Sequence, residues 1–153
     1  ESYTRSFSII DGYMYIVGNS IYRIDYQNEY DIVNVYELPE KIQGTVGLCK
    51  IQDYYYLTIY TDKGFNRNPG FIRTTQLENI INGDYESIYN ELGFTGTPYL
   101  MTEIDGRYYV AEVDQENGIV GFDIADNIIV NVHKIFSFGS GNMDSIVRFY
   151  SAY

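Results

Sequence analysis

One pattern constrains this chain more than any other: an apolar run, a tight turn and a second apolar run occur together three times. The clearest copy lies within residues 96–123, where Asp105-Gly106 separates the first two runs and a third run follows a polar turn. Asp-Gly between apolar runs is a strong β-hairpin signal. Similar turns are predicted at Asp11-Gly12 and Gln52-Asp53. The sequence therefore predicts an all-β chain built from a repeated unit.

The spacing of aromatic residues supports this repeat. The pairs Met14-Tyr15, Tyr55-Tyr56 and Tyr108-Tyr109 fall in the second strand of each unit, about 40 and about 50 residues apart. Repeats of four short strands at such a period are typical of β-propeller blades. We therefore expect three four-stranded antiparallel blades and one extra strand in a single domain. Their expected bounds are 1–40, 44–93 and 96–138 for the blades and 142–153 for the extra strand.

The second unit is the least regular of the three. A long polar excursion at residues 62–70 separates its second and third strands. After the third strand, cap residues on either side of residues 77–81 favour a helical turn there. An outer strand is expected at residues 85–91.

Three short segments resemble the blades of β-propeller proteins of the NHL and YWTD kind. Two of them, Ile21-Tyr22-Arg23-Ile24-Asp25 and Ile119-Val120-Gly121-Phe122-Asp123, are third strands, and Gly96-Thr97-Pro98-Tyr99 opens a first strand. The resemblance extends over nearly the whole chain, although no regular blade-closing Trp-Asp dipeptide is present. It implies a closed ring of about four to eight blades. Three blades would then be part of a longer propeller, or would form a six-bladed homodimer. A β-sandwich also accounts for short strands with regular turns and is the alternative fold.

Charge and hydropathy exclude several classes of partner. The formal net charge is −11, so a nucleic-acid backbone and an anionic lipid surface would both be repelled. No apolar run is long enough to span a bilayer, so membrane insertion is not expected. An acidic chain favours a neutral or basic partner. The richness in Ile, Asn and Tyr is compatible with a low-GC bacterial source, and the composition does not separate a cytosolic from a secreted or cell-surface location.

Blade geometry predicts where ligand-binding residues would gather. The second-to-third-strand loops and the blade-to-blade connections share one face of the disc, and loops on a rigid scaffold often carry binding residues. The starts of the first strands approach the central axis. The candidate binding residues are Asp62, Lys63, Asn66 and Arg67 on the loop face, and Thr45, Thr97, Tyr99, Asn142 and Asp144 at the axis mouth. For the threonines the alternative is a hydroxyl that satisfies a backbone group, and for Tyr99 a packed ring.

Few residues in the chain carry the chemistry of catalysis or metal binding. Cys49 is the single cysteine and lies in an apolar run, where a small buried hydrophobic role is expected. His133 is the single histidine, so no histidine cluster can form within one chain. We therefore predict no metal, no cofactor and no catalytic residues.

The sequence thus favours a non-catalytic recognition module that binds a protein or a glycan. The first alternative is part of a glycan hydrolase or lyase whose active site is completed by other blades or a second chain. Such an enzyme would cluster carboxylates with shifted pKa values at the axis, where Glu103 and Asp144 are the candidates. A purely structural module, with a large apolar interface and no pocket, is the second alternative.

Overall fold

The structure is a computed structural model that describes residues 4–59, 70–113 and 118–137. These residues form three four-stranded antiparallel sheets, each with its strands in simple up-and-down order. The strands of the first sheet are β1 (Thr4–Ile10), β2 (Tyr13–Gly18), β3 (Ser20–Asp25) and β4 (Asp31–Glu37). Those of the second are β5 (Thr45–Ile51), β6 (Tyr54–Ile59), β7 (Phe71–Thr74) and β8 (Glu86–Ser87). The third contains β9 (Thr97–Ile104), β10 (Arg107–Val113), β11 (Gly118–Ala125) and β12 (Ile128–Ser137).

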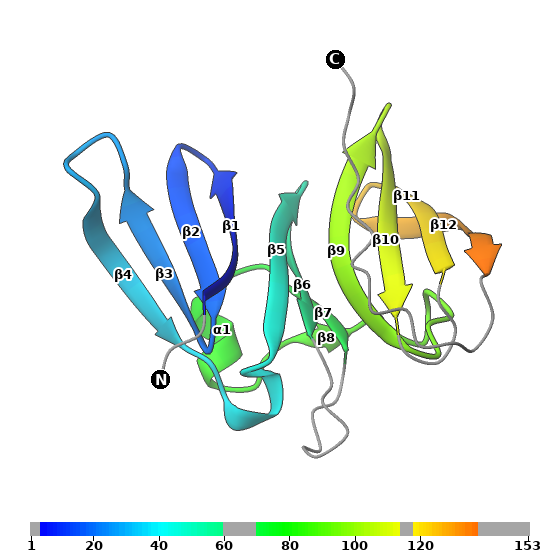
Figure 1. Cartoon of the computed structure of the whole chain (residues 1–153), viewed down its shortest axis with the longest axis horizontal. Coiled ribbons are helices and arrows are strands. Elements are labelled where there is room, and N and C mark those ends of the chain that lie inside the picture. Colours follow the sequence, from blue (N-terminus) through cyan, green and yellow to red (C-terminus); the bar gives the residue numbers. More distant parts are fainter. Residues whose placement is uncertain (1–3, 60–69, 114–117, 138–153) are drawn as a thin grey trace.

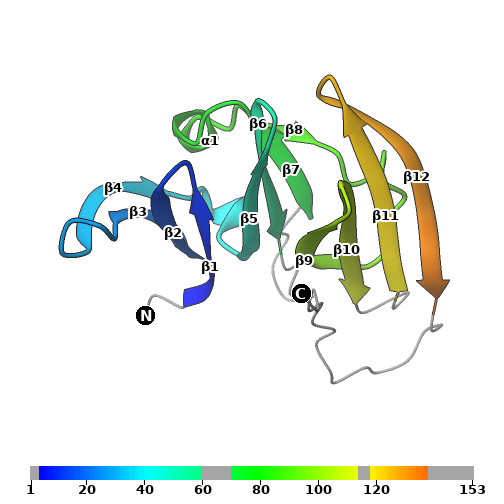
Figure 2. The same cartoon turned by 90° about the horizontal axis from the view of Figure 1, so that it is seen from above.

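The predicted all-β class and the three antiparallel four-stranded units are confirmed. We call the three sheets blades 1, 2 and 3. They stand in a row with β1, β5 and β9 next to one another, while β4, β8 and β12 lie farther out (Figures 1 and 2). The described residues do not form two sheets packed as a sandwich, which is the alternative fold. The expected extra strand at 142–153 lies outside the described residues.

Local backbone geometry explains the hairpins. Asp11 and Gly12 both have positive φ, at 50° and 81°, and so do Asp105 and Gly106, at 51° and 79°. Two successive residues of this kind make the turn whose twist matches an antiparallel strand pair, and Asp-Gly adopts it readily. The first hairpins of blades 1 and 3 are therefore determined by these dipeptides.

The main core lies between neighbouring blades. A first cluster joins blade 1 to blade 2 and includes Tyr15 and Ile21 on one side and Leu57 and Ile72 on the other. A second cluster joins blade 2 to blade 3 and surrounds Phe71. Burial of apolar side chains at these two junctions is the main force holding the blades together.

Two hydroxyl groups connect successive blades in the same way. The Ser6 hydroxyl on β1 donates to the carbonyl of Val46 at the start of β5. The Thr58 hydroxyl on β6 donates to the carbonyl of Tyr99 at the start of β9. Each bond satisfies a carbonyl on the first strand of the next blade, so it fixes that strand against its neighbour.

The outer part of blade 2 differs from the prediction. A helix, α1 (Glu78–Ile81), forms inside the expected helical turn, but the expected strand at residues 85–91 is reduced to β8. The amide of Leu92 donates to the Ile88 carbonyl at 3.1 Å, and the amide of Phe94 donates to the Tyr89 carbonyl at 3.3 Å. This helical curl buries Ile88, Leu92 and Phe94 in the second cluster. Burial of these apolar side chains stabilises the curled segment.

Among the described residues, none of the helices has the length and apolar character needed to cross a membrane.

Candidate functional site

Most of the predicted binding residues cannot be placed. Asp62, Lys63, Asn66 and Arg67 belong to residues 60–69, and Asn142 and Asp144 belong to residues 138–153, so all six lie outside the described residues. Asp144, the predicted carboxylate partner of Glu103, is therefore not placed either. Glu103 itself is exposed on β9, and its carboxylate accepts a hydrogen bond from the Gly106 amide at 3.2 Å.

The three predicted axis residues that the structure describes stand at the starts of β5 and β9. Thr45 is buried, and its hydroxyl donates to the Ile42 carbonyl at 2.7 Å. Thr97 is buried as well, and Tyr99 is half-buried on β9. The Thr45 hydroxyl therefore satisfies a backbone group, which is the alternative role stated for it above.

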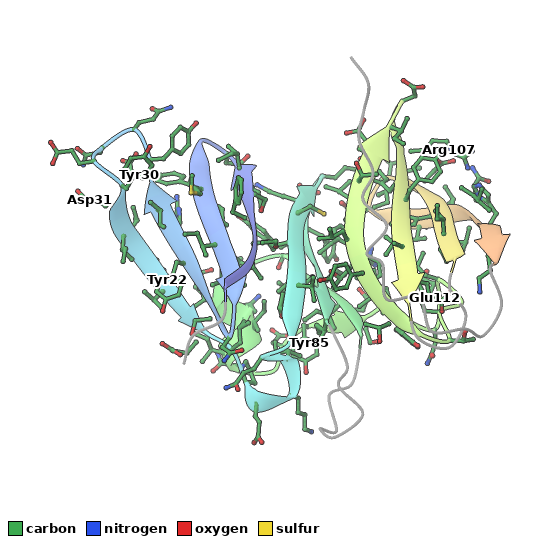
Figure 3. The ribbon with its side chains drawn as sticks, in the orientation of Figure 1. Tyr22, Tyr30, Asp31, Tyr85, Arg107 and Glu112 are labelled. Atoms are coloured by element: carbon green, nitrogen blue, oxygen red, sulfur yellow. The ribbon has the colours of Figure 1, made fainter. Side chains whose placement is uncertain are left out.

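A surface that the sequence analysis did not single out is the side of blade 1 turned away from blade 2. Strand register places eight apolar side chains on this side, and each pairs directly with a neighbour on the next strand. We call it the outer face of blade 1. Its members are Phe7, Ile9, Met14, Ile16, Tyr22, Ile24, Ile32 and Val35. Tyr22, one of them, lies on blade 1 far from the other two blades (Figure 3).

Four of these eight side chains are exposed to water, whereas Ile24 is only 8% exposed. The exposed fraction is 69% for Phe7, 51% for Ile9 and 61% for Ile32. The hairpin registers show that Met14 and Ile16 correspond to Tyr55 and Leu57 of blade 2 and to Tyr108 and Val110 of blade 3.

In blades 2 and 3 the preceding blade covers these equivalent positions. The outer face of blade 1 is thus a blade-packing surface that no other blade covers among the described residues. An exposed apolar patch of this kind is typical of an interaction site.

A second surface is a hollow between blades 1 and 2, which we call the interblade pocket. It has a volume of about 380 Å³ and lies on the side of the β1–β2 and β5–β6 turns. This is the opposite side from the loop face favoured by the sequence analysis. The lining combines tyrosines, two basic groups and three carboxylates: Tyr15, Tyr36, Tyr55, Arg23, Lys50, Asp11, Asp53 and Glu78.

Tyrosines join the two walls of the pocket. The rings of Tyr15 and Tyr55 lie 6.5 Å apart at an angle of 54°. The Tyr36 hydroxyl donates to a Glu78 carboxylate oxygen at 3.3 Å. Burial, followed by the nearby Glu78 charge, raises the pKa of the Tyr36 hydroxyl above its usual value. The hydroxyl therefore stays protonated and remains a hydrogen-bond donor at neutral pH.

The two basic groups of the pocket are held differently. Lys50 Nζ forms an ion pair with Asp11 Oδ2 at 2.5 Å. The Arg23 guanidinium carbon lies 3.8 Å from the centre of the Tyr13 ring, a cation–π arrangement. The Nε atom of Arg23 is buried and has no hydrogen-bond partner among the described residues. Buried donors without a hydrogen-bond partner are rare in proteins, so an acceptor is expected for this Nε atom.

The third blade carries charged groups at both ends (Figure 3). At one end Arg107 Nε donates to Asp123 Oδ1 at 2.8 Å, and Asn131 donates to the other carboxylate oxygen at 2.9 Å. These bonds, the one from Asn131 most strongly, hold the pKa of Asp123 below its usual value. At the other end Glu112 is fully buried and forms an ion pair with Lys134 at 3.1 Å.

The arrangement of Glu112 is structural. One of its oxygens accepts hydrogen bonds from the amides of Thr95 and Gly96, both at 2.6 Å. Its other oxygen contacts Lys134. The carboxylate thus fixes the connection that leads into β9. Within the part of the chain that the structure describes, no three His, Cys, Asp or Glu side chains are grouped so that they could hold a metal ion.

Cys49 on β5 is expected to resist thiol reagents. Burial raises the pKa of its thiol to about 12, so at pH 8 the reactive thiolate fraction is on the order of 10⁻⁴. We expect labelling by an iodoacetamide reagent to be at least about tenfold slower in the folded protein than in denaturant. Mass spectrometry measures the two labelling rates. Equal rates in the folded and the denatured protein would show that the Cys49 thiol is accessible in the fold.

The fold and these surfaces define an all-β protein of three meander blades, in which the described residues of the other blades leave the outer face of blade 1 uncovered. No protein-family model and no curated protein matches the chain. Among solved structures, the chain is similar to the crystal structure of the N-terminal domain of Nup159, with a TM-score of 0.44 and 7% sequence identity. That similarity covers 91% of this chain and 45% of the other, so this chain spans less than half the length of that structure.

Proposed function

We propose that this protein is a non-catalytic interaction module that binds a protein partner through the outer face of blade 1. The observation that carries the proposal is the open state of this face, whose equivalents on blades 2 and 3 are each covered by a neighbouring blade. In this proposal the three units, with bounds 1–40, 44–93 and 96–138, are propeller blades that resemble those of the NHL and YWTD kind.

A second copy of this chain is the partner that the chemistry favours. The outer face of blade 1 is apolar over all four strands. The corresponding free side of blade 3 carries the Arg107–Asp123 ion pair and the exposed His133, which match an apolar surface poorly. When two copies pair their outer faces of blade 1 about a two-fold axis, the apolar surface of one copy is buried against the same apolar surface of the other. Such a dimer is closed and does not continue into a filament.

The test is the mass of the protein in solution, measured by light scattering over a range of concentrations. We expect twice the mass of one chain for the wild-type protein. The variant Ile9→Lys places a charge on the outer face and is expected to weaken association about tenfold or more. Its control is Ile81→Lys on α1, because both isoleucines have an exposed fraction of 51%.

Ile81→Lys should leave the association unchanged, because the described residues place α1 away from the outer face of blade 1. A wild-type protein that is a monomer at all concentrations would overturn the proposed pairing. An equal effect of the two lysine variants would also contradict it, since a charge on any surface would then weaken association.

A further inference from the structure

Blades 1 and 2 carry an arginine at the same place in their third strands. Arg23 lies directly opposite Tyr15 on β2, and Arg73 lies directly opposite Tyr56 on β6. The two tyrosines occupy equivalent positions, since each is two residues beyond the first residue paired across its hairpin turn. The two junctions, between blades 1 and 2 and between blades 2 and 3, can therefore be compared group by group.

At the junction of blades 2 and 3 the arginine has its partners. Arg73 Nη1 donates to the Asn127 carbonyl at 2.7 Å, and Arg73 Nε donates to Glu86 at 2.8 Å. Asn127 belongs to the turn between β11 and β12, and it also bonds to Gln52 at 2.6 Å and to Asp53 at 2.7 Å. A hairpin turn of blade 3 thus fills the junction and supplies an acceptor to the arginine.

At the junction of blades 1 and 2 this turn is replaced. Where blade 3 has the short β11–β12 turn, blade 2 has a longer connection that contains α1. The connection lines the junction with Gln76 and Glu78 but leaves the interblade pocket open. Arg23 is stacked on Tyr13 as Arg73 is on Tyr54. Its buried Nε has no acceptor among the described residues, because Asn34 stands opposite Arg23 where Glu86, which accepts from Arg73 Nε, stands opposite Arg73.

We propose that the interblade pocket binds a neutral saccharide, one of whose oxygens accepts a hydrogen bond from the Arg23 guanidinium, as the Asn127 carbonyl does from Arg73 Nη1 at the other junction. The inference does not depend on the pairing of blade 1 faces, because the pocket lies on the opposite side of blade 1. The sequence predicted glycan binding on the loop face or at the axis mouth, and the inference places it in the interblade pocket instead.

The mixed lining favours hydroxyl groups over a charged ligand. The pocket combines Arg23 and Lys50 with the carboxylates of Asp11, Asp53 and Glu78. A sugar hydroxyl can accept from the former and donate to the latter, and no charge needs to be buried. An anion would meet three carboxylates in a chain whose net charge is −11.

The size and the aromatic walls of the pocket fit the same ligand class. Small-molecule sites begin at about 300 Å³, so a pocket of about 380 Å³ suits one or two sugar rings. Tyr55 lines the pocket and is half-buried, and an aromatic ring is a surface on which the C–H groups of a sugar can pack.

The experiment is a titration of the full chain followed by NMR at the Arg23 Nε–Hε resonance. The neutral probes are glucose, galactose, mannose and N-acetylglucosamine, and the charged probes are glucuronate and inorganic phosphate. We expect at least one neutral sugar to shift this resonance with a dissociation constant of about 1 mM, a weak affinity in the range expected for a small ligand. Arg23→Met should weaken that binding about tenfold, the effect of losing a hydrogen bond to a charged group.

Two further variants keep the test decisive. Arg107→Met removes an arginine from blade 3 and should leave binding within about twofold of wild type. Gln76→Trp places a large side chain at the exposed rim of the pocket and should block binding even if Arg23→Met does not fold. A shift by none of the neutral sugars, or tighter binding of glucuronate or phosphate than of any neutral sugar, would overturn the inference. Normal binding by Gln76→Trp would do so as well.

Discussion

Replacing Phe71 with alanine is expected to lower the free energy of unfolding by about 3–5 kcal/mol, the usual cost of removing a buried aromatic ring. The ring is 0% exposed at the start of β7. It makes edge-on contacts with Tyr56, Phe94 and Phe122, with ring centres 5.9–6.4 Å apart. These partners come from blade 2, its curled outer segment and blade 3. The loss of one side chain therefore leaves a cavity where three parts of the fold meet.

Chemical denaturation followed by tyrosine fluorescence or circular dichroism measures this effect. The matched control is Tyr30→Ala, which removes an aromatic ring at the tip of the β3–β4 hairpin (Figure 3), where the exposed fraction is 67%. That change should alter stability by no more than about 0.5 kcal/mol. Similar losses for the two variants would contradict the assignment of Phe71 to a core shared by blades 2 and 3.

Replacing Glu112 with alanine is expected to cost about 3 kcal/mol, because it breaks a buried ion pair and leaves backbone donors without an acceptor. The carboxylate is 1% exposed and accepts hydrogen bonds from the amides of Thr95 and Gly96. Lys134 on β12 loses this counter-charge at the same time. We expect faster hydrogen exchange at residues 95 and 96 together with the loss of global stability.

Glu103→Ala is the control for this second change. Glu103 also accepts one backbone amide, but it is exposed on β9. Its replacement should change the free energy of unfolding by less than about 0.5 kcal/mol. If Glu112→Ala had an equally small effect, with unchanged exchange at residues 95 and 96, the carboxylate would not be the group that fixes this connection.

Local sequence signals were sufficient for the hairpins and for the number of sheets. Asp11-Gly12 and Asp105-Gly106 determine two turns through their preference for positive φ, and the tyrosine pairs mark the second strands. The alternation of side chains along a strand also carries information that the sequence analysis did not use. It places Glu112 on the same side as the buried Val110, and Arg23 on the same side as the buried Ile21, so both charged groups could have been identified as junction residues.

The candidate surfaces were harder to predict. The loop face was favoured because it holds the longest polar excursion, but that excursion lies outside the described residues. The outer face of blade 1 has the same alternating pattern as the covered faces of blades 2 and 3. The residues of this face therefore do not indicate whether another blade covers it. The interblade pocket is open because the connection between β7 and β8 does not fill the junction as the β11–β12 turn does. The sequence of β3, including Arg23, carries no information about that connection.

The sequence alone determined the all-β class, the repeated hairpin and the three-unit organisation, because turn preference and side-chain alternation act between residues that are close along the chain. Only the tertiary structure decided which blade faces are covered and which junction stays open. These outcomes depend on contacts between residues 40 or more positions apart, such as Ser6 with Val46 and Arg73 with Asn127. The replacement of a short turn by α1 in blade 2 leaves the interblade pocket open beside Arg23, because the turn that offers the Asn127 carbonyl to Arg73 belongs to the following blade.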